Sequence, residues 1–285
     1  MHLLVYFEIF AIVALSLNLL LGYGGLLQVA HAGYYGIGAY AATLLWTNLG
    51  LGFIPGLLLA GVFAGCLSLL VSLPARHFKG DYFVMVSIAV QALIYAVLYN
   101  WTSVTNGPFG ISGIPKPEIV GIEFRSTGSV ILLYGLLALI FGGVITLLKR
   151  SPFGRALQAL RDDELAARSI GIPVDKIKLQ VFAIASALVG CAGGLYASYV
   201  SYIDPTSFNL NESILMLSMV VVGGVGNIRG PLLGAFILIT LPEILRFVEL
   251  PDPVAANLRL LIYGFLLIIL MLVRPQGLAG NYRYQ

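Results

Sequence analysis

Long apolar runs with few charged residues follow one another along this chain, and short polar breaks separate them. Most runs approach the ~20 residues that a helix needs to cross the hydrocarbon layer of a bilayer, while Ile214–Val225 and Gly33–Leu49 are shorter. The predicted membrane segments are Leu3–Leu21, Gly33–Leu49, Ile54–Leu73, Tyr82–Asn100, Val130–Leu148, Leu179–Ser201, Ile214–Val225, Pro231–Val248 and Leu258–Val273. We therefore expect an all-α integral membrane protein, a polytopic helical bundle of about 8–10 transmembrane segments.

Composition supports this class. Hydrophobic residues make up 59% of the 285 positions, charged residues make up 10%, and the mean hydropathy is +0.95. These values lie outside the usual range of soluble globular domains. We expect a single transmembrane domain over residues 1–285, in which Cys66 and Cys191 act as small buried hydrophobes. The net charge of +3 follows from the polar loops, so no nucleic-acid partner is expected.

One polar island interrupts the apolar pattern. Residues 149–178 carry seven Lys or Arg and four Asp or Glu. Because short loops rich in basic residues stay on the cytoplasmic side, this island is predicted to be a cytoplasmic loop. Alternation outward from it, with nine crossings, predicts an outer N-terminus and a cytoplasmic C-terminus. Residues 101–128, with three prolines and several turn signals, are predicted to form an ordered loop outside.

The island itself is predicted to contain a short amphipathic helix on the membrane surface. Ser151 and Pro152 are a helix-start signal, and Gly171 is a stop signal. Glu164 and Arg168 have the i,i+4 spacing of a favourable ion pair, worth roughly 0.3 kcal/mol. The expected helix runs from Arg155 to Gly171.

Two glycine-rich passages, Gly22–Gly25 and Gly223–Gly226, each follow an apolar segment and precede small residues. Such a pair suggests an internal repeat, and in transporters paired glycine-interrupted segments often mark broken or re-entrant helices at the substrate site. The alternative is that these glycines only allow helices to pack closely, as Gly190 and Gly194 do.

Polar side chains inside membrane segments are costly and are by default functional candidates. The candidates for a translocation pathway are Asn18, Gln28, His31, Gln91 and Asn227. The alternative is that they pair with broken backbone or bridge helices. No GxxxxGK[ST] or HExxH sequence occurs, so the chain is not expected to hydrolyse ATP, to have catalytic residues, or to bind a metal or cofactor.

The island also carries a family resemblance. The passage from Pro152 to Ile172 strongly resembles the coupling region of ATP-binding-cassette (ABC) importer permeases of the branched-chain amino acid type, and Glu164–Ala167 with Gly171 resembles the EAA-and-glycine motif of that superfamily. The passages 22–38, 78–83, 106–111 and 223–231 are similar to the M-type permease subunit. The ATPase-coupling residues that the resemblance implies are Arg155, Leu160, Arg161, Asp162, Glu164, Ala166, Ala167, Arg168 and Gly171.

The resemblance implies a transport subunit, not an enzyme. Such a permease moves branched-chain or related hydrophobic amino acids into the cytoplasm by alternating access in the bacterial inner membrane. Its implied partners are a homologous H-type permease, two cytoplasmic ABC ATPase subunits and a periplasmic substrate-binding protein. Urea and short-chain amide permeases share these motifs and remain an alternative, as does a passive small-solute channel, which would need no soluble partner.

Overall fold

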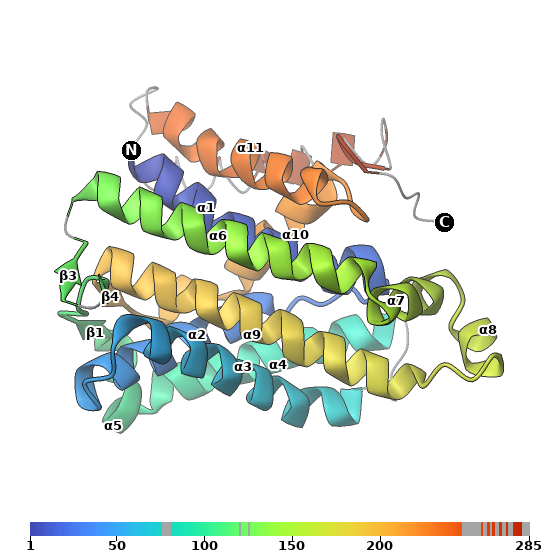
Figure 1. Cartoon of the computed structure of the whole chain (residues 1–285), viewed down its shortest axis with the longest axis horizontal. Coiled ribbons are helices and arrows are strands. Elements are labelled where there is room, and N and C mark those ends of the chain that lie inside the picture. The colour runs from blue at the N-terminus through green and yellow to red at the C-terminus, as the bar shows by residue number, and fades with distance from the viewer. Residues whose placement is uncertain are drawn as a thin grey trace.

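The computed structural model describes residues 1–75, 81–119, 121–124, 126–246 and 276–280, with isolated positions between 258 and 272. Helices dominate the described residues, which confirms the predicted all-α polytopic class (Figure 1). The helices are α1 (His2–Asn18), α2 (His31–Asn48), α3 (Phe53–Ala75), α4 (Asp81–Asn100), α5 (Thr102–Thr105), α6 (Thr127–Arg150), α7 (Pro152–Asp162), α8 (Glu164–Ser169), α9 (Val174–Val200), α10 (Leu210–Gly223) and α11 (Arg229–Arg246).

Five helical segments of the described part are long and apolar enough to span a membrane. They are His2–Tyr23, Phe53–Leu73, Tyr82–Asn100, Thr127–Arg150 and Val174–Val200. The first includes a π-helix, Leu19–Tyr23, that continues α1. The predicted segment at residues 214–225 corresponds to the short helix α10, which has 14 residues and begins four residues earlier than expected. The predicted segment 258–273 lies largely outside the described residues, so the number of crossings stays a prediction.

Helix α9 lies at the centre of the bundle and packs against α1, α2 and α3. Small residues make this packing possible. A Cβ atom on Gly38 of α2 would lie 2.1 Å from the carbonyl oxygen of Gly190, and one on Gly193 would lie 2.0 Å from the carbonyl oxygen of Tyr35. The backbones of α2 and α9 are therefore in contact, as small residues permit between membrane helices.

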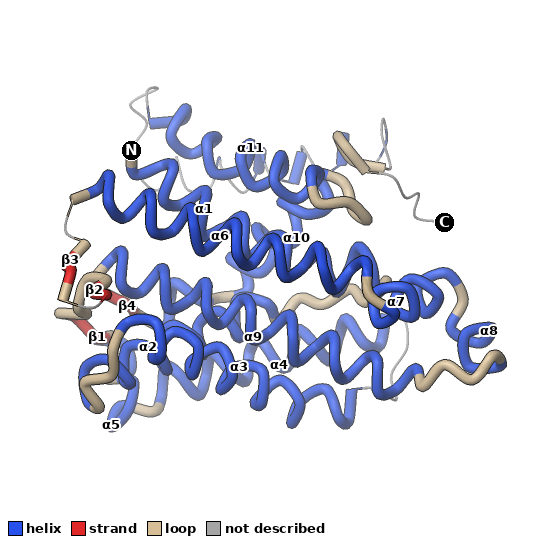
Figure 2. The backbone as a smooth tube through the Cα atoms, viewed as in Figure 1, coloured by secondary structure: helices blue, strands red, loops and turns tan. Residues whose placement is uncertain are grey.

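The two ends of the bundle are built differently (Figure 2). At one end, α5 and a 3₁₀ turn (Gly107–Phe109) lie beside four short strands, β1 (Ile111–Ser112), β2 (Glu118–Ile119), β3 (Ile122–Glu123) and β4 (Tyr202–Ile203). Strand β1 pairs antiparallel with β4, and β2 pairs with β3. At the other end lie α7 and α8 (Figure 1). Loop 101–128 and island 149–178 are thus at opposite ends.

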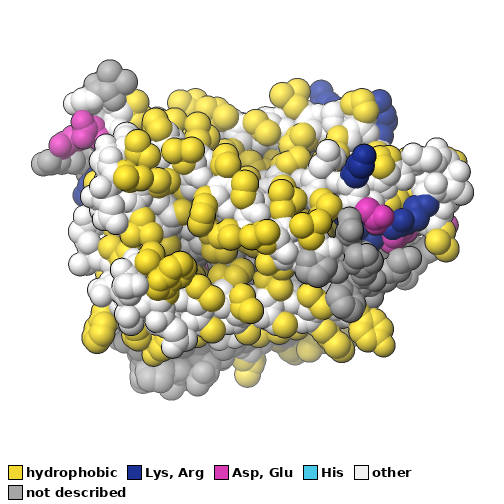
Figure 3. All heavy atoms as spheres, turned by 90° about the horizontal axis from the view of Figure 1, so that it is seen from below, with side chains coloured by type: hydrophobic (Ala, Val, Ile, Leu, Met, Phe, Trp, Pro, Cys, Tyr) yellow, Lys and Arg dark blue, Asp and Glu magenta, His cyan; other side chains and the backbone are white. Residues whose placement is uncertain are grey.

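The sides of the bundle expose large apolar residues, and Figure 3 shows one such face covered with hydrophobic side chains. The most exposed apolar residues on α3, α4 and α6 include Leu70, Tyr82, Met85, Leu132, Leu139 and Leu147. Surfaces of this extent are expected where lipid replaces water as the solvent. Cys66 also lies on the exposed side of α3, so the prediction that it is buried was wrong, while Cys191 is buried.

Candidate functional site

The polar island folds into two helices, so the expectation of one helix from Arg155 to Gly171 was wrong. Helix α7 begins as predicted, with the Ser151 hydroxyl accepting a hydrogen bond from the Gly154 N–H at 3.3 Å. The chain breaks at Asp163, whose carboxylate accepts hydrogen bonds from the N–H groups of Leu165 and Ala166, at 2.8 and 3.0 Å. Asp163 therefore caps a second helix, α8, since an N-cap side chain replaces the missing helical acceptors.

The end of α8 depends on Gly171, as predicted. Its φ of +86° lies in the left-handed region that glycine adopts without strain. The Ile172 N–H donates to the Ala167 carbonyl oxygen at 3.1 Å, which closes the helix in a Schellman-type arrangement. A Cβ atom on Gly171 would meet nothing within 4 Å, so only the backbone conformation requires glycine here.

Ion pairs attach α8 to the start of α9. The predicted Glu164–Arg168 pair is confirmed at 3.1 Å, and Glu164 also accepts from the Lys178 ammonium at 2.9 Å. Arg168 pairs with Asp175 at 2.7 Å. The hydrogen bonds that its guanidinium donates to Asp175 and Glu164 raise the pKa of Arg168 above its ordinary value, so the guanidinium stays charged.

Helix α7 is attached to the end of the first membrane helix. The Arg161 guanidinium donates to the Gly22 carbonyl oxygen at 2.8 Å and also pairs with Asp162 at 3.0 Å. Leu157 packs over Gly24, where a Cβ atom would lie 3.1 Å from its Cδ1. These contacts belong to a separate apolar cluster that joins both short helices to α1 and α9, and it includes Leu19, Leu20, Tyr23, Leu157, Leu160, Ala167, Val174 and Ile177.

Among the described residues, the opposite surface of this helix pair is exposed and partly apolar. Leu165 is 70% exposed and Ile170 is 74% exposed. Of the predicted coupling residues, Arg155, Asp162, Ala166 and Arg168 are exposed as well, whereas Leu160 and Ala167 are buried against the bundle. Ile170, the C-cap residue of α8, therefore belongs to this exposed surface.

Within the bundle, the chain unwinds between α1 and α2, over residues 25–30. Helix α2 starts among buried residues, and its N-cap residue, Ala30, provides no side-chain cap. Side chains from other helices replace it: the Ala32 N–H donates to the Ser213 hydroxyl at 3.0 Å, and the Gly33 N–H donates to the Gln91 amide oxygen at 2.7 Å. These hydrogen bonds give partners to backbone N–H groups at the start of α2, which are buried away from water.

Gln91 also holds a second interruption. Between α9 and α10 the chain passes through β4 and a 3₁₀ turn, Pro205–Phe208, before α10 begins. The Gln91 amide nitrogen donates to the Phe208 carbonyl oxygen at 2.8 Å, and the Ser213 hydroxyl donates to the Gln91 amide oxygen at 3.2 Å. One glutamine in the middle of α4 therefore joins the starts of α2 and α10.

The two glycine-rich passages of the sequence meet through Asn18. Its amide nitrogen donates to the Asn227 carbonyl oxygen at 2.8 Å, and its amide oxygen accepts from the Gly226 N–H at 3.2 Å. A Cβ atom on Gly22 would lie 2.7 Å from the Gly226 nitrogen. The Asn227 side chain in turn accepts from the Gly230 N–H at 2.6 Å and donates to the Ala279 carbonyl oxygen.

Gln28 and His31 retain unused hydrogen-bonding capacity. The His31 Nε2 atom lies 2.9 Å from the Ser16 hydroxyl, which donates to the Val13 carbonyl oxygen, so Nε2 is the donor and Nδ1 is left as an acceptor. Among the described residues, neither that Nδ1 atom nor the Gln28 amide oxygen has a partner. Of the five pathway candidates, Asn18, Gln91 and Asn227 bridge backbone segments. Gln28 and His31 are the two that keep a buried polar atom without a partner among the described residues.

Sequence reasoning missed several polar residues that lie in or beside this region. Ser16, Ser213 and Tyr35 sit in apolar runs, where a lone hydroxyl carries no distinguishing signal. Glu212 does carry a signal, because it follows Asn209 by three residues, the spacing of a capping box. The Asn209 amide oxygen accepts from the Glu212 N–H at 3.1 Å, so this spacing identifies the true start of α10.

The chain is similar to known proteins over nearly its whole length. Residues 1–271 match the family model described as the permease component of the branched-chain amino acid transport system. The chain is 36% identical to the high-affinity branched-chain amino acid transport system permease protein LivM of Escherichia coli strain K12, over 97% of this chain and 69% of that protein. It is 27% identical to the probable LivM of Methanocaldococcus jannaschii, over 96% and 91% of the two chains.

A more distant similarity is to the permease protein LivH of Salmonella typhimurium, at 24% identity over 95% of this chain and 91% of that protein. No solved structure matches the chain. The alignments to both kinds of permease cover nearly the whole of this chain.

Proposed function

The chain belongs to the branched-chain amino acid transport permease family, and on that premise we propose that it is a membrane subunit of an ABC importer. It moves branched-chain or related hydrophobic amino acids toward the cytoplasm by alternating access. The single observation that carries this proposal is the helix pair α7–α8, which is attached to the bundle by an apolar cluster and ion pairs on one side and has a partly apolar exposed surface on the other. A passive channel has no need for such a surface.

The proposed partner of that surface is a cytoplasmic ABC ATPase. Leu165 and Ile170 provide exposed apolar contacts beside the charged side chains of Arg155 and Arg168. Interfaces of this kind combine an apolar centre with a polar rim. The resemblance to the coupling motif supports the same partner, with two ATPase subunits serving two permeases.

The remaining partners follow from the family. Relatives named LivM and LivH both match nearly the whole chain, which supports a pair of homologous permeases, with this chain, more similar to LivM, as the M-type member. A periplasmic binding protein would deliver the substrate to the end formed by loop 101–128. The complex would lie in the bacterial inner membrane, with α7, α8 and the C-terminus in the cytoplasm.

Movement of the ATPase would be transmitted directly to the membrane bundle through α7. When the docked helices move, Arg161 and Leu157 carry the end of α1 with them, because packed helices move as rigid bodies. The residues that follow are the unwound segment 25–30, which leads into α2. We propose that its movement opens and closes the path past Gln28 and His31, while Asn18, Gln91 and Asn227 hold the surrounding backbone.

The experiment that tests coupling compares two substitutions of Gly171 in the complex reconstituted into vesicles. Gly171→Val forces a β-branched residue into a left-handed conformation, whereas Gly171→Asn is compatible with it. We expect the valine variant to hydrolyse ATP with little leucine uptake, and the asparagine variant to stay coupled. Glu164→Lys, which places a cation against Arg168 and Lys178, is expected to uncouple as well. Equal ATP-dependent uptake in all variants would refute the assignment.

A further inference from the structure

A cavity of about 420 Å³ lies between α1, α10 and α11. Its volume falls within the range of about 300 to 1,000 Å³ that is usual for small-molecule sites. It adjoins a second cavity of about 590 Å³, because Leu3, Tyr6 and Glu243 line both. Lys116 and Thr127, which belong to loop 101–128, line the second cavity, so the two cavities together lead from the predicted outer end into the bundle.

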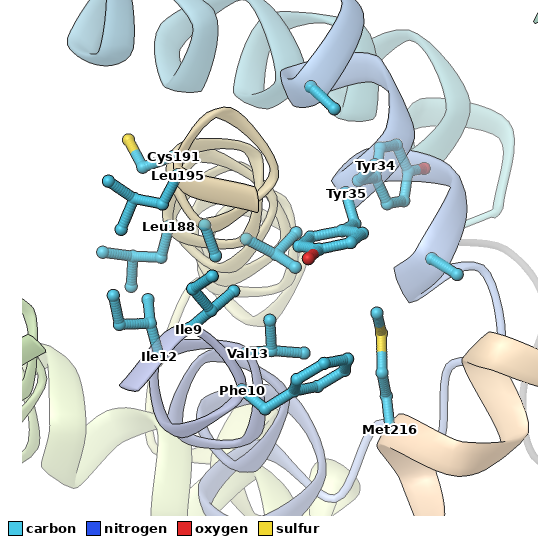
Figure 4. Packing of buried hydrophobic residues seen from close by; sticks show 14 of the residues in the cluster. Ile9, Phe10, Ile12, Val13, Tyr34, Tyr35, Leu188, Cys191, Leu195 and Met216 are labelled. Atoms are coloured by element: carbon cyan, nitrogen blue, oxygen red, sulfur yellow. The ribbon is translucent and has the colours of Figure 1, made fainter. Parts of the chain in front are cut away.

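Two polar groups in the first cavity are not used by the fold. The carboxylate of Glu212 lines it and, within the part of the chain that the structure describes, receives no hydrogen bond. The Tyr35 side chain is only 2% exposed, and its hydroxyl also lacks a partner among those residues. Figure 4 shows the Tyr35 ring extending from α2 toward the space between α1 and α9. Polar groups that are buried or half-buried normally have partners, so a half-buried carboxylate and a buried hydroxyl without them in one cavity indicate a polar ligand.

The other walls of the cavity are aromatic and aliphatic. The aromatic residues are Tyr6, Phe10, Tyr35 and Tyr196, with the Tyr35 and Tyr196 ring centres 5.6 Å apart. The aliphatic residues are Leu3, Leu215, Met219, Leu238 and Ile239. Aromatic faces and carboxylates attract a cationic group, while the aliphatic wall favours a branched apolar group. The cavity therefore offers both kinds of contact to one small molecule.

We propose that this cavity is a transit site for an aliphatic amino acid zwitterion. The Glu212 carboxylate accepts hydrogen bonds from the α-ammonium group, and the Tyr35 hydroxyl donates one to the α-carboxylate. The aliphatic wall packs against the side chain. This assignment rests on the proposed function and names a binding site within it. Tyr35 and His31 are four residues apart on α2 and so share one helix face, which connects the site to the unwound segment 25–30.

Protection of a cysteine from a thiol reagent tests the site. Ser207 lines the cavity, and Ser207→Cys would be introduced in a chain carrying Cys66→Ser and Cys191→Ala. The complete transporter in proteoliposomes would be labelled with and without leucine. We expect leucine to slow the labelling, and 4-methyl-2-oxopentanoate, which has the same side chain but no ammonium group, not to slow it.

Two variants and a control separate binding from folding. Glu212→Gln removes the charge without changing the shape, and we expect it to raise the leucine concentration for half-maximal protection by about ten- to a hundredfold, the effect of losing one charge-assisted hydrogen bond. Tyr35→Phe removes a hydroxyl that has no partner, so it should weaken protection without loss of thermal stability. Glu118→Gln, at an exposed position of β2, should leave protection unchanged.

Labelling that is independent of leucine, equal protection by the oxo acid, or unchanged protection in Glu212→Gln would each overturn the site. ATP-dependent uptake, measured on the same vesicles, reports separately on the proposed function. ATP-dependent uptake without protection by leucine would support the proposed function and contradict the proposed site. Protection without ATP-dependent uptake would support the site and contradict the function.

Discussion

At the scale of single residues, Gln91 shows how polar side chains keep this bundle together. Its amide oxygen accepts from the Gly33 N–H and the Ser213 hydroxyl, and its amide nitrogen donates to the Phe208 carbonyl oxygen. The sequence identified Gln91 as a polar residue in an apolar segment. It could not identify the partners, because two of the three lie more than a hundred residues away along the chain.

We expect Gln91→Leu to lower the thermal stability of the purified protein. The substitution leaves the Gly33 N–H and the Phe208 carbonyl oxygen buried without partners, at a cost of about 1–3 kcal/mol for each. Asn100→Leu is the matched control, since Asn100 is at the exposed end of the same helix and, among the described residues, its amide binds only the Ala96 carbonyl oxygen. Thermal unfolding in detergent should separate the two, and equal melting temperatures would contradict the bridging role.

His31→Leu and Gln28→Leu address the proposed path. Each removes a buried polar group with unused capacity, so we expect assembly to be preserved and transport to slow by roughly fivefold, about the effect of one hydrogen bond to the passing solute. Uptake by vesicles and recovery of the intact complex would both be measured. Full uptake rates with normal assembly would remove these residues from the path.

At the scale of elements, the sequence predicted one interruption of the helical bundle and missed another. It predicted a break near Gly22–Gly25, and the chain does unwind directly after it. It did not predict the interruption at residues 201–209, although Pro205 and the Asn209 cap are the local signals there. The glycines at 223–226 instead end α10 and let the chain approach Asn18.

The sequence also failed to predict the break between α7 and α8. The apolar spacing continues through residues 155–171, and an acidic Asp162-Asp163-Glu164 run fits either an exposed helix turn or a new cap. The ion pairs of Glu164 and Arg168 with α9 favour the cap. Those contacts depend on tertiary structure, so the local pattern alone could not decide between the two.

Asp163→Ala should loosen α8 and leave α7 intact. Loss of an N-cap costs about 0.5–2 kcal/mol, which is large for a helix of six residues. Hydrogen exchange of residues 164–169 should therefore become faster. Asp162→Ala is the control, because among the described residues its carboxylate pairs only with Arg161 and caps no helix. Equal exchange rates in the two variants would show that the cap does not hold α8.

At the scale of the whole molecule, the charge pattern predicted which loops lie at opposite ends of the bundle, and the structure separates loop 101–128 from α7 and α8 (Figure 1). Which end faces the cytoplasm remains a prediction from the basic residues. The number of membrane crossings is also a prediction, because residues 247–275 are described only at isolated positions.

Single cysteines at Ser112 and Lys176 test the orientation. Both positions are exposed, and both would be introduced in a chain without Cys66 and Cys191. An impermeant thiol reagent applied to intact cells should label position 112 and label position 176 only after the membrane is permeabilised. Labelling of position 176 in intact cells would reverse the topology.

The most direct measurement is the composition and ATP dependence of the purified complex. We expect the affinity-tagged chain to carry a homologous permease and soluble ATPase subunits with it, and to import leucine in vesicles only when ATP is supplied. Leu165→Asp combined with Ile170→Asp should release the ATPase subunits and keep the second permease, because both side chains lie on the exposed surface of the α7–α8 pair. A chain that purifies without any ATPase subunit, and whose solute uptake does not respond to ATP, would contradict the importer function and favour a passive channel.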